Sequence, residues 1–119
     1  MKDLAEALPG IERIKLRFLS LLEERQAVIA LHTLAAWDSK HAQERRDHLE
    51  VAQNTLHQIA GSAGSLGFDE LGQTASDCES EIVSHLQDPE SDRLPLPAEI
   101  MGRIDGFISM SESLLIERA

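Results

Sequence analysis

The chain has 119 residues and a formal net charge of −10, with one cysteine and no tyrosine. This length predicts a single domain over residues 1–119, and a hydrophobic fraction of 42% is sufficient for one folded core. The acidic excess argues against nucleic acid and anionic membranes as partners, because both attract basic surfaces. No apolar run approaches the about 18 residues of a membrane span, and residues 1–10 lack the apolar run of a signal peptide. We therefore expect a cytoplasmic protein whose partners are other proteins.

Apolar residues recur at helical spacing along the chain, and no segment alternates as a strand would. A first long helix is predicted for residues of about 11–37, with residues 1–8 adding a short helical turn that covers one end. Asp38 or Ser39 can cap a second helix that starts near Lys40. The apolar stripe predicted for the first helix contains Ile11, Ile14, Phe18, Leu21, Leu22, Val28, Ile29, Leu31 and Leu34. That of the second contains Leu49, Ala52, Leu56, Ile59, Ala63 and Leu66.

Two further helices follow in the second half of the chain. Gly67 ends the second helix, and Asp69 can cap a third helix that extends to about Leu86. Residues 87–97 contain three prolines and form the one long loop, before a fourth helix at about 98–118. The residues predicted to face inward are Leu71, Ala75, Cys78 and Ile82 in the third helix, and Ile100, Ile104, Phe107 and Leu114, with Met101 and Ile108, in the fourth. We predict an all-α fold, an antiparallel four-helix bundle with a short extra N-terminal helical segment.

Helical geometry separates His57 from the other histidines, which are His32, His41, His48 and His85. The apolar stripe of the second helix centres near Ala52 and Leu56, and at about 100° per residue His57 points roughly 130° away from it, toward solvent. His41 and His48 fall on or near the core side, where a hydrogen-bonded structural histidine is the simpler interpretation. His57 is therefore the candidate nucleophile.

Small residues follow His57 on the same side of the helix. Gly61 and Gly64 lie one and two turns further along, and Ala60 is also small. A glycine inside a helix costs about 1 kcal/mol relative to alanine, so two of them need a reason. One reason is that bare backbone lets a partner's concave site close over the imidazole. The alternatives are that another helix of the same bundle packs against the glycines, or that His57 is an ordinary surface histidine.

Residues 57–68, His-Gln-Ile-Ala-Gly-Ser-Ala-Gly-Ser-Leu-Gly-Phe, followed by Leu71 and Cys78-Glu79, resemble the signature of the histidine phosphotransfer (HPt) domain family. The resemblance centres on about 25 residues, and the predicted helices extend it over nearly the whole chain. It implies that His57 accepts a phosphoryl group from the aspartyl phosphate of a receiver domain and returns it to another receiver.

The resemblance also implies the partners and the surface that meets them. We expect response-regulator receiver domains and a hybrid sensor histidine kinase as partners, and a phosphocarrier without turnover of its own. No cofactor or metal is expected on this chain, because the receiver supplies Mg²⁺. The expected partner-binding residues are Gln53, Asn54, Gln58, Ala60, Gly61, Gly64 and Ser65.

Ala60 departs from the family pattern, in which a lysine often occupies the position three residues after the histidine. Hydrogen bonds could come from Gln53, Gln58, Ser62 or Ser65, but none of these side chains supplies a charge. Arg45 and Arg46 are the first cations to examine as a replacement.

Other functions fit the residues less well. A histidine-kinase dimerisation domain usually has an acid and then a proline after its histidine, whereas Gln58 and Ile59 follow here. His41 and His48 with Glu44 could suggest a metal site, but a spacing of seven residues separates the histidines by about 10 Å. A helical-bundle module that binds receivers or other signalling proteins without phosphorylation remains the main alternative.

Three further expectations concern surfaces and assembly. Glu79 and Glu81 are expected to be solvated, Trp37 to close the end of the bundle, and Cys78 to be a small buried apolar residue. We expect a monomer. Whether the chain is free-standing or part of a larger kinase stays open, as do the identities of the kinase, the regulator and the signal.

Overall fold

The computed structural model describes residues 9–117, and every regular element within this range is helical. The all-α class is therefore confirmed. The short N-terminal helical turn expected for residues 1–8 lies outside the described residues. The elements are α2 (Pro9–Asp38), α3 (Ala42–Ala63), the 3₁₀ helix η1 (Gly64–Leu66), α4 (Asp69–Gln87), the 3₁₀ helix η2 (Pro89–Arg93) and α5 (Ala98–Glu117).

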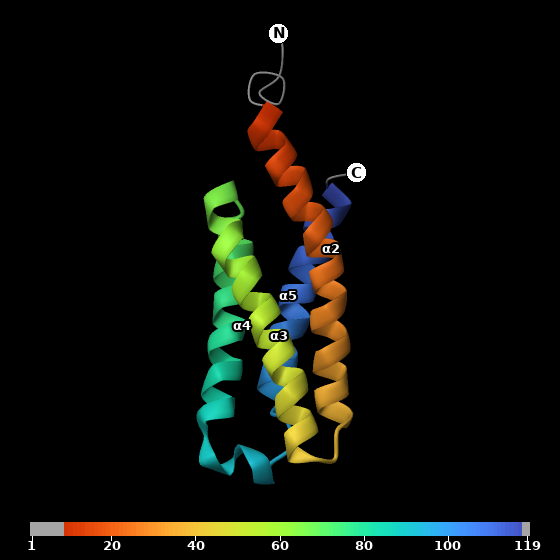
Figure 1. Cartoon of the computed structure of the whole chain (residues 1–119), viewed down its shortest axis with the longest axis vertical. Helices are drawn as coiled ribbons and strands as arrows, with labels where there is room; N and C mark the ends of the chain where they lie inside the picture. The colour runs from red at the N-terminus through yellow and green to blue at the C-terminus, as the bar shows by residue number, and fades with distance from the viewer. Residues whose placement is uncertain (1–8, 118–119) are drawn as a thin grey trace.

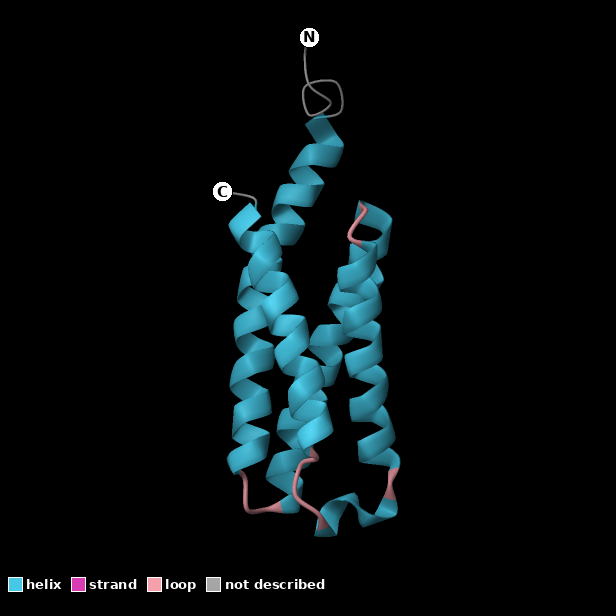
Figure 2. Cartoon of the chain, turned by 180° about the vertical axis from the view of Figure 1, so that it is seen from behind, coloured by secondary structure: helices cyan, strands magenta, loops and turns pink. Residues whose placement is uncertain are grey.

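The four long helices lie side by side along the long axis of the molecule (Figure 1). Successive helices run in opposite directions, and connections at the two ends join them (Figure 2). α2 and α4 each contact both α3 and α5, so the order around the bundle is α2, α3, α4, α5. This arrangement creates a groove between α3 and α4 on one side and a groove between α2 and α5 on the opposite side.

The helices begin and end close to the capping and stop residues predicted from the sequence, with small shifts. The Ser39 hydroxyl accepts a hydrogen bond from the His41 backbone N–H at 3.4 Å, and α3 begins at Ala42, two residues after the predicted start. Gly67 ends η1 with φ of 89°, a left-handed conformation that glycine adopts without steric cost. Asp69 is the first residue of α4 rather than its cap, and part of the predicted long loop forms η2.

The core of α3, α4 and α5 is the predicted one. In α3 the stripe from Leu49 to Ala63 is buried, and Leu66 packs half-buried at its end. The remaining buried apolar residues of these helices are Leu71, Ala75, Cys78, Ile82, Ile100, Ile104 and Phe107. Ring stacking of Phe18 on Phe68, with centroids 5.2 Å apart, joins α2 to the start of α4.

The stripe predicted for α2 is partly wrong. Ile11, Ile14, Leu31 and Leu34 are exposed, whereas Ile29 is fully buried. Ile11 and Ile14 lie on the N-terminal part of α2, which extends beyond the ends of the other helices (Figure 1). Leu31 and Leu34 lie on the outer face, because they are turned about 200° and 140° from Ile29. Trp37, expected to close the bundle end, is also 49% exposed.

Candidate functional site

His57 lies on α3 at the groove with α4, and its side chain is 72% exposed. Its Nδ1 atom lies 2.9 Å and 3.1 Å from the two carboxylate oxygens of Glu79 on α4. An ionised carboxylate only accepts hydrogen bonds, so Nδ1 carries the hydrogen in this contact. The neutral imidazole then keeps its lone pair on Nε2, the ring nitrogen that Glu79 does not engage.

Glu79 is held in place by a second contact. Gln53, one turn before His57, donates from Nε2 to a carboxylate oxygen of Glu79 at 2.8 Å. The Glu79 side chain is only 17% exposed. The expectation that Glu79 is merely solvated is therefore wrong: it links α4 to two side chains of α3. Glu81 instead pairs with Arg103 at 3.3 Å.

The small-residue face beside His57 is open. A Cβ atom added at Gly61 would meet nothing within 4 Å, and one at Gly64 would meet only the Asp69 carboxylate at 3.9 Å. The glycine that permits close helix packing is Gly72 on α4, where an added Cβ would lie 3.3 Å from Ala63. Internal packing therefore does not explain Gly61 and Gly64.

Two hollows flank His57 along the groove between α3 and α4. One, of about 360 Å³, is lined by Ala60, Gly64, Asp69, Gly72, Gln73 and Ser76. The other, of about 380 Å³, is lined by Arg46, Glu50, Gln53, Asn54, Val83, Leu86 and Gln87. Among the expected partner-binding residues, Asn54, Gln58, Gly61, Gly64 and Ser65 are exposed, while Gln53 and Ala60 are half-buried. Of the expected residues, Gln53 and Asn54 thus line one hollow, and Ala60 and Gly64 line the other.

Several expected hydrogen-bond donors are already engaged. The hydroxyl of Ser62 donates to the Gln58 carbonyl at 3.2 Å, and that of Ser65 donates to the Ser62 carbonyl at 3.0 Å. Both hydroxyls therefore satisfy backbone carbonyls of their own helix end rather than point a free proton toward the imidazole.

Arg45 and Arg46 hold the far end of the bundle together. Arg45 is buried and donates to the Ser39 and Asp92 carbonyls, at 3.4 and 3.3 Å. Arg46 pairs with the Asp92 carboxylate at 3.3 Å and donates to the Leu86 carbonyl at 3.1 Å. Both precede His57 by eleven or twelve residues, about 17 Å along the helix. Neither can offset a charge on His57.

The other histidines and Cys78 lack the features of an exposed nucleophile beside an acid. His32 and His48 share a 2.9 Å contact between their Nδ1 atoms. His41, expected on the core side, is exposed because it precedes the first turn of α3.

Burial, followed by the nearby positive charge of Arg45, lowers the pKa of His85. Burial raises the pKa of the Cys78 thiol to about 11. Residues 9–117 contain no group of three side chains suited to a metal ion.

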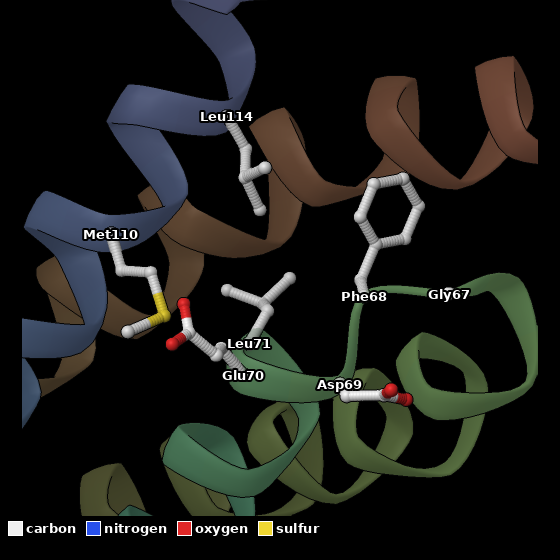
Figure 3. Close-up of a pocket in the computed structure, with 7 residues that line it drawn as sticks. All are labelled: Gly67, Phe68, Asp69, Glu70, Leu71, Met110 and Leu114. Carbon is white, nitrogen blue, oxygen red and sulfur yellow. The ribbon is translucent and has the colours of Figure 1, made fainter.

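A further pocket of about 250 Å³ is lined by residues 67–71, Met110 and Leu114 and does not include His57 (Figure 3). Its apolar lining comes from the start of α4, with Phe68 and Leu71, and from the end of α5, with Met110 and Leu114. Asp69 points away from these side chains. Its lining contains no histidine, cysteine or basic residue. It offers apolar surface but no nucleophile.

The chain also matches a known protein family. The model of the family described as "Hpt domain" matches residues 13–113, which contain all of α3, α4, the glycine face and His57. Comparisons with curated proteins and with solved structures found no match. None of the described helices is both long enough and apolar enough to cross a membrane. Because the family match covers most of the chain, this protein belongs to the Hpt domain family, whose members carry out histidine phosphotransfer in two-component phosphorelays.

Proposed function

We propose that His57 accepts a phosphoryl group at Nε2 from the aspartyl phosphate of a receiver domain and passes it to a second receiver. The observation that carries this proposal is the asymmetry of the imidazole. Glu79 engages Nδ1, and Nε2 projects from a side chain that is 72% exposed.

The transfer needs little from this chain beyond a positioned nucleophile. The Nε2 lone pair attacks phosphorus, the bond from phosphorus to the aspartyl oxygen breaks, and the receiver carboxylate leaves with that electron pair. The imidazole keeps its Nδ1 hydrogen and becomes positively charged. The Glu79 carboxylate, at 2.9 Å, stabilises that charge in the phosphorylated ring. Transfer to the second receiver reverses these steps.

The remaining groups belong to the receiver. Phosphoryl transfer is mostly positioning and charge neutralisation, and we assign Mg²⁺ and the reactive aspartate to the receiver. The open face of Gly61 and Gly64 allows its concave active site to approach Nε2 closely. The domain then acts as a phosphocarrier, and we place it in the cytoplasm with its receiver partners and a hybrid sensor kinase.

Transfer from a phosphorylated receiver tests the proposal, with intact-mass analysis as the readout. Wild-type protein should gain one phosphoryl group that is labile in acid and stable in alkali. His57→Gln should abolish the gain while the helical circular dichroism stays unchanged, because the side chain projects into solvent. His41→Gln is the matched control, since His41 is also exposed and lies next to the same helix.

Two outcomes would contradict the assignment. One is labelling that persists in His57→Gln and disappears in His41→Gln. The other is receiver binding without any phosphoryl gain, which is the behaviour of a docking module that is not phosphorylated.

A further inference from the structure

His32 on α2 and His48 on α3 form a pair of imidazoles that the phosphotransfer site does not use. The two helices lie side by side (Figure 1), and the Nδ1 atoms of the two rings are 2.9 Å apart. The ring centroids are 5.1 Å apart, and the ring planes are tilted by 41°. Because the centroids are farther apart than the Nδ1 atoms, these two nitrogens face each other between the helices.

Spacing along α3 does not reveal this pair. From the sequence, His48 is compared with His41 on its own helix, and the seven residues between them are too many for one ion. The packing of α2 against α3 instead brings His48 a partner that lies sixteen residues earlier in the chain. The expectation that this chain holds no metal considered only the first of these two arrangements.

The hydrogen bond between the two rings is not fixed by other groups. One Nδ1 donates and the other accepts, because a neutral imidazole carries a single N–H. Neither Nε2 has a hydrogen-bond partner among residues 9–117, and no carboxylate in that range orients either ring. His57 differs, because Glu79 engages its Nδ1. His32 and His48 can therefore both carry their hydrogen on Nε2 and offer both Nδ1 lone pairs to one ion.

We propose that His32 and His48 bind one divalent transition-metal ion through their Nδ1 atoms, with Cu²⁺ the most tightly bound. A bond from such an ion to an imidazole nitrogen is about 2.0–2.1 Å long, so two bonds at a right angle separate the nitrogens by about 2.9 Å. This is the separation between the two Nδ1 atoms here. A tetrahedral angle, which Zn²⁺ prefers, requires about 3.4 Å. Right angles are typical of tetragonal Cu²⁺ and Ni²⁺ sites, and Cu²⁺ has the highest affinity for nitrogen ligands.

The surroundings of the pair suit a cation. The net charge of −10 attracts positive ions to the chain. Both histidines are half-buried, so the pair keeps access to solvent while two helices hold its ligands together before an ion arrives. Water completes the coordination, because residues 9–117 provide no third His, Cys, Asp or Glu to this site. Mg²⁺ prefers oxygen ligands, so the site is separate from the Mg²⁺ that we assign to the receiver.

The metal site and His57 lie on opposite faces of α3. His48 precedes His57 by nine residues, which turns it about 180° around the helix axis and places it about 14 Å along that axis. An ion at His48 therefore lies toward α2, whereas His57 lies at the groove with α4. The metal site does not rest on the proposed phosphotransfer, and each can fail without the other.

Isothermal titration calorimetry with Cu²⁺ alone tests the site. His32→Gln and His48→Gln should each weaken the tightest binding event at least about ten-fold, because the second ligand no longer binds intramolecularly. His41→Gln is the matched control and should keep the wild-type affinity, since it removes an exposed histidine that contacts no other histidine. His57→Gln should also keep it. Excess Mg²⁺ should not compete with Cu²⁺.

Electron paramagnetic resonance of the Cu²⁺ complex counts the coordinating nitrogens. The wild-type spectrum should show coupling to two imidazole nitrogens, and the His32→Gln spectrum to one. The wild-type spectrum decides the question even where a variant loses helical circular dichroism. Coupling to a single nitrogen in the wild type overturns the proposal, as does equal Cu²⁺ affinity of the wild type and a folded His32→Gln. Either result leaves His32 and His48 as a hydrogen-bonded structural pair.

Discussion

His57 and Glu79 meet across the α3–α4 groove, and their contact engages only one of the two ring nitrogens, Nδ1. The carboxylate holds the hydrogen on Nδ1 and fixes the ring orientation, while Nε2 stays open to a partner. Gln53 and the low exposure of Glu79 keep the carboxylate in place before any partner binds. Residues of this chain thus orient the imidazole without a partner.

Replacing Glu79 by Gln should slow phosphoryl transfer to His57 a few-fold without unfolding the protein. The amide keeps the shape and can still contact Nδ1, but it removes the negative charge that stabilises the phosphorylated ring. The effect is modest because the imidazole is largely exposed and solvent screens the pair. The measurement is the initial transfer rate from one phosphorylated receiver. Glu81→Gln, whose carboxylate pairs with Arg103 instead, serves as control, and equal rates for both variants would refute the role of Glu79.

Thr33 is a buried residue of α2 whose hydroxyl has no hydrogen-bond partner among the described residues. Thr33→Val keeps the shape and removes that hydroxyl, so it should raise the free energy of unfolding by about 1 kcal/mol. Thr55→Val is the matched comparison, because the Thr55 hydroxyl donates to the Val51 carbonyl at 2.8 Å. Urea denaturation should show no gain for Thr55→Val. A loss of stability in Thr33→Val would mean that its hydroxyl is hydrogen-bonded in solution.

At the scale of the element, α3 combines a fully buried stripe with an unusually bare outer face. Leu56 and Ile59 anchor the helix in the core on either side of His57 in sequence. Gly61 and Gly64 add nothing to that packing, and they lower the intrinsic helix propensity of the segment. The two glycines lower the local stability of α3 beside His57, and the tertiary contacts of its buried stripe compensate.

Gly61→Ala should therefore raise the free energy of unfolding by up to about 1 kcal/mol, since alanine favours the helix and the added Cβ meets nothing. Gly61→Leu should also fold but should weaken receiver binding through steric exclusion beside His57. Gly106→Leu on α5 is the control, because Gly106 is equally unobstructed and lies away from His57. Isothermal titration calorimetry against one receiver measures the affinity of Gly61→Leu and of Gly106→Leu, and only the first should be weaker. Unchanged receiver affinity of Gly61→Leu would show that the receiver does not contact this face.

At the scale of the whole molecule, the phosphoryl group that we propose for His57 would add negative charge to a chain that already carries −10. The two arginines considered from sequence are committed to η2 and the end of the bundle. Ala60, where the family often has lysine, lines a hollow with Asp69 and uncharged polar residues. Neither Arg45, Arg46 nor the side chain at position 60 would therefore offset the charge of a phosphate on His57.

Ala60→Lys should shift the equilibrium with a receiver toward phosphohistidine and lengthen its lifetime. The ammonium would lie one turn from His57, and an exposed ion pair contributes about 0.2–1 kcal/mol, which corresponds to a change of a few-fold. High salt should reduce the shift. Gly102→Lys on α5 makes the same change in net charge far from His57 and should leave the equilibrium unchanged. A partition of phosphate that is equal in the two variants would show that only the total charge matters.

The amino-acid sequence by itself determined the local features of this protein. Periodic apolar residues indicated the all-helical class and the buried stripe of α3, because helix geometry relates neighbours along one chain. Capping residues, Gly67 and the prolines indicated the approximate helix ends. The same geometry identified His57 as exposed and placed Gly61 and Gly64 beside it. The match to the Hpt family covers residues 13–113, which include His57, Gly61 and Gly64.

The tertiary structure alone decided which helices face one another. The order and rotation of the helices around the bundle bring Glu79 to His57 and Asp92 to Arg46. They also leave Leu34 outside the core. These contacts join residues far apart in sequence, and periodicity gives the width of an apolar stripe but not the neighbour that covers it. A long helix such as α2 carries apolar residues on two sides, and only packing shows which side the core occupies.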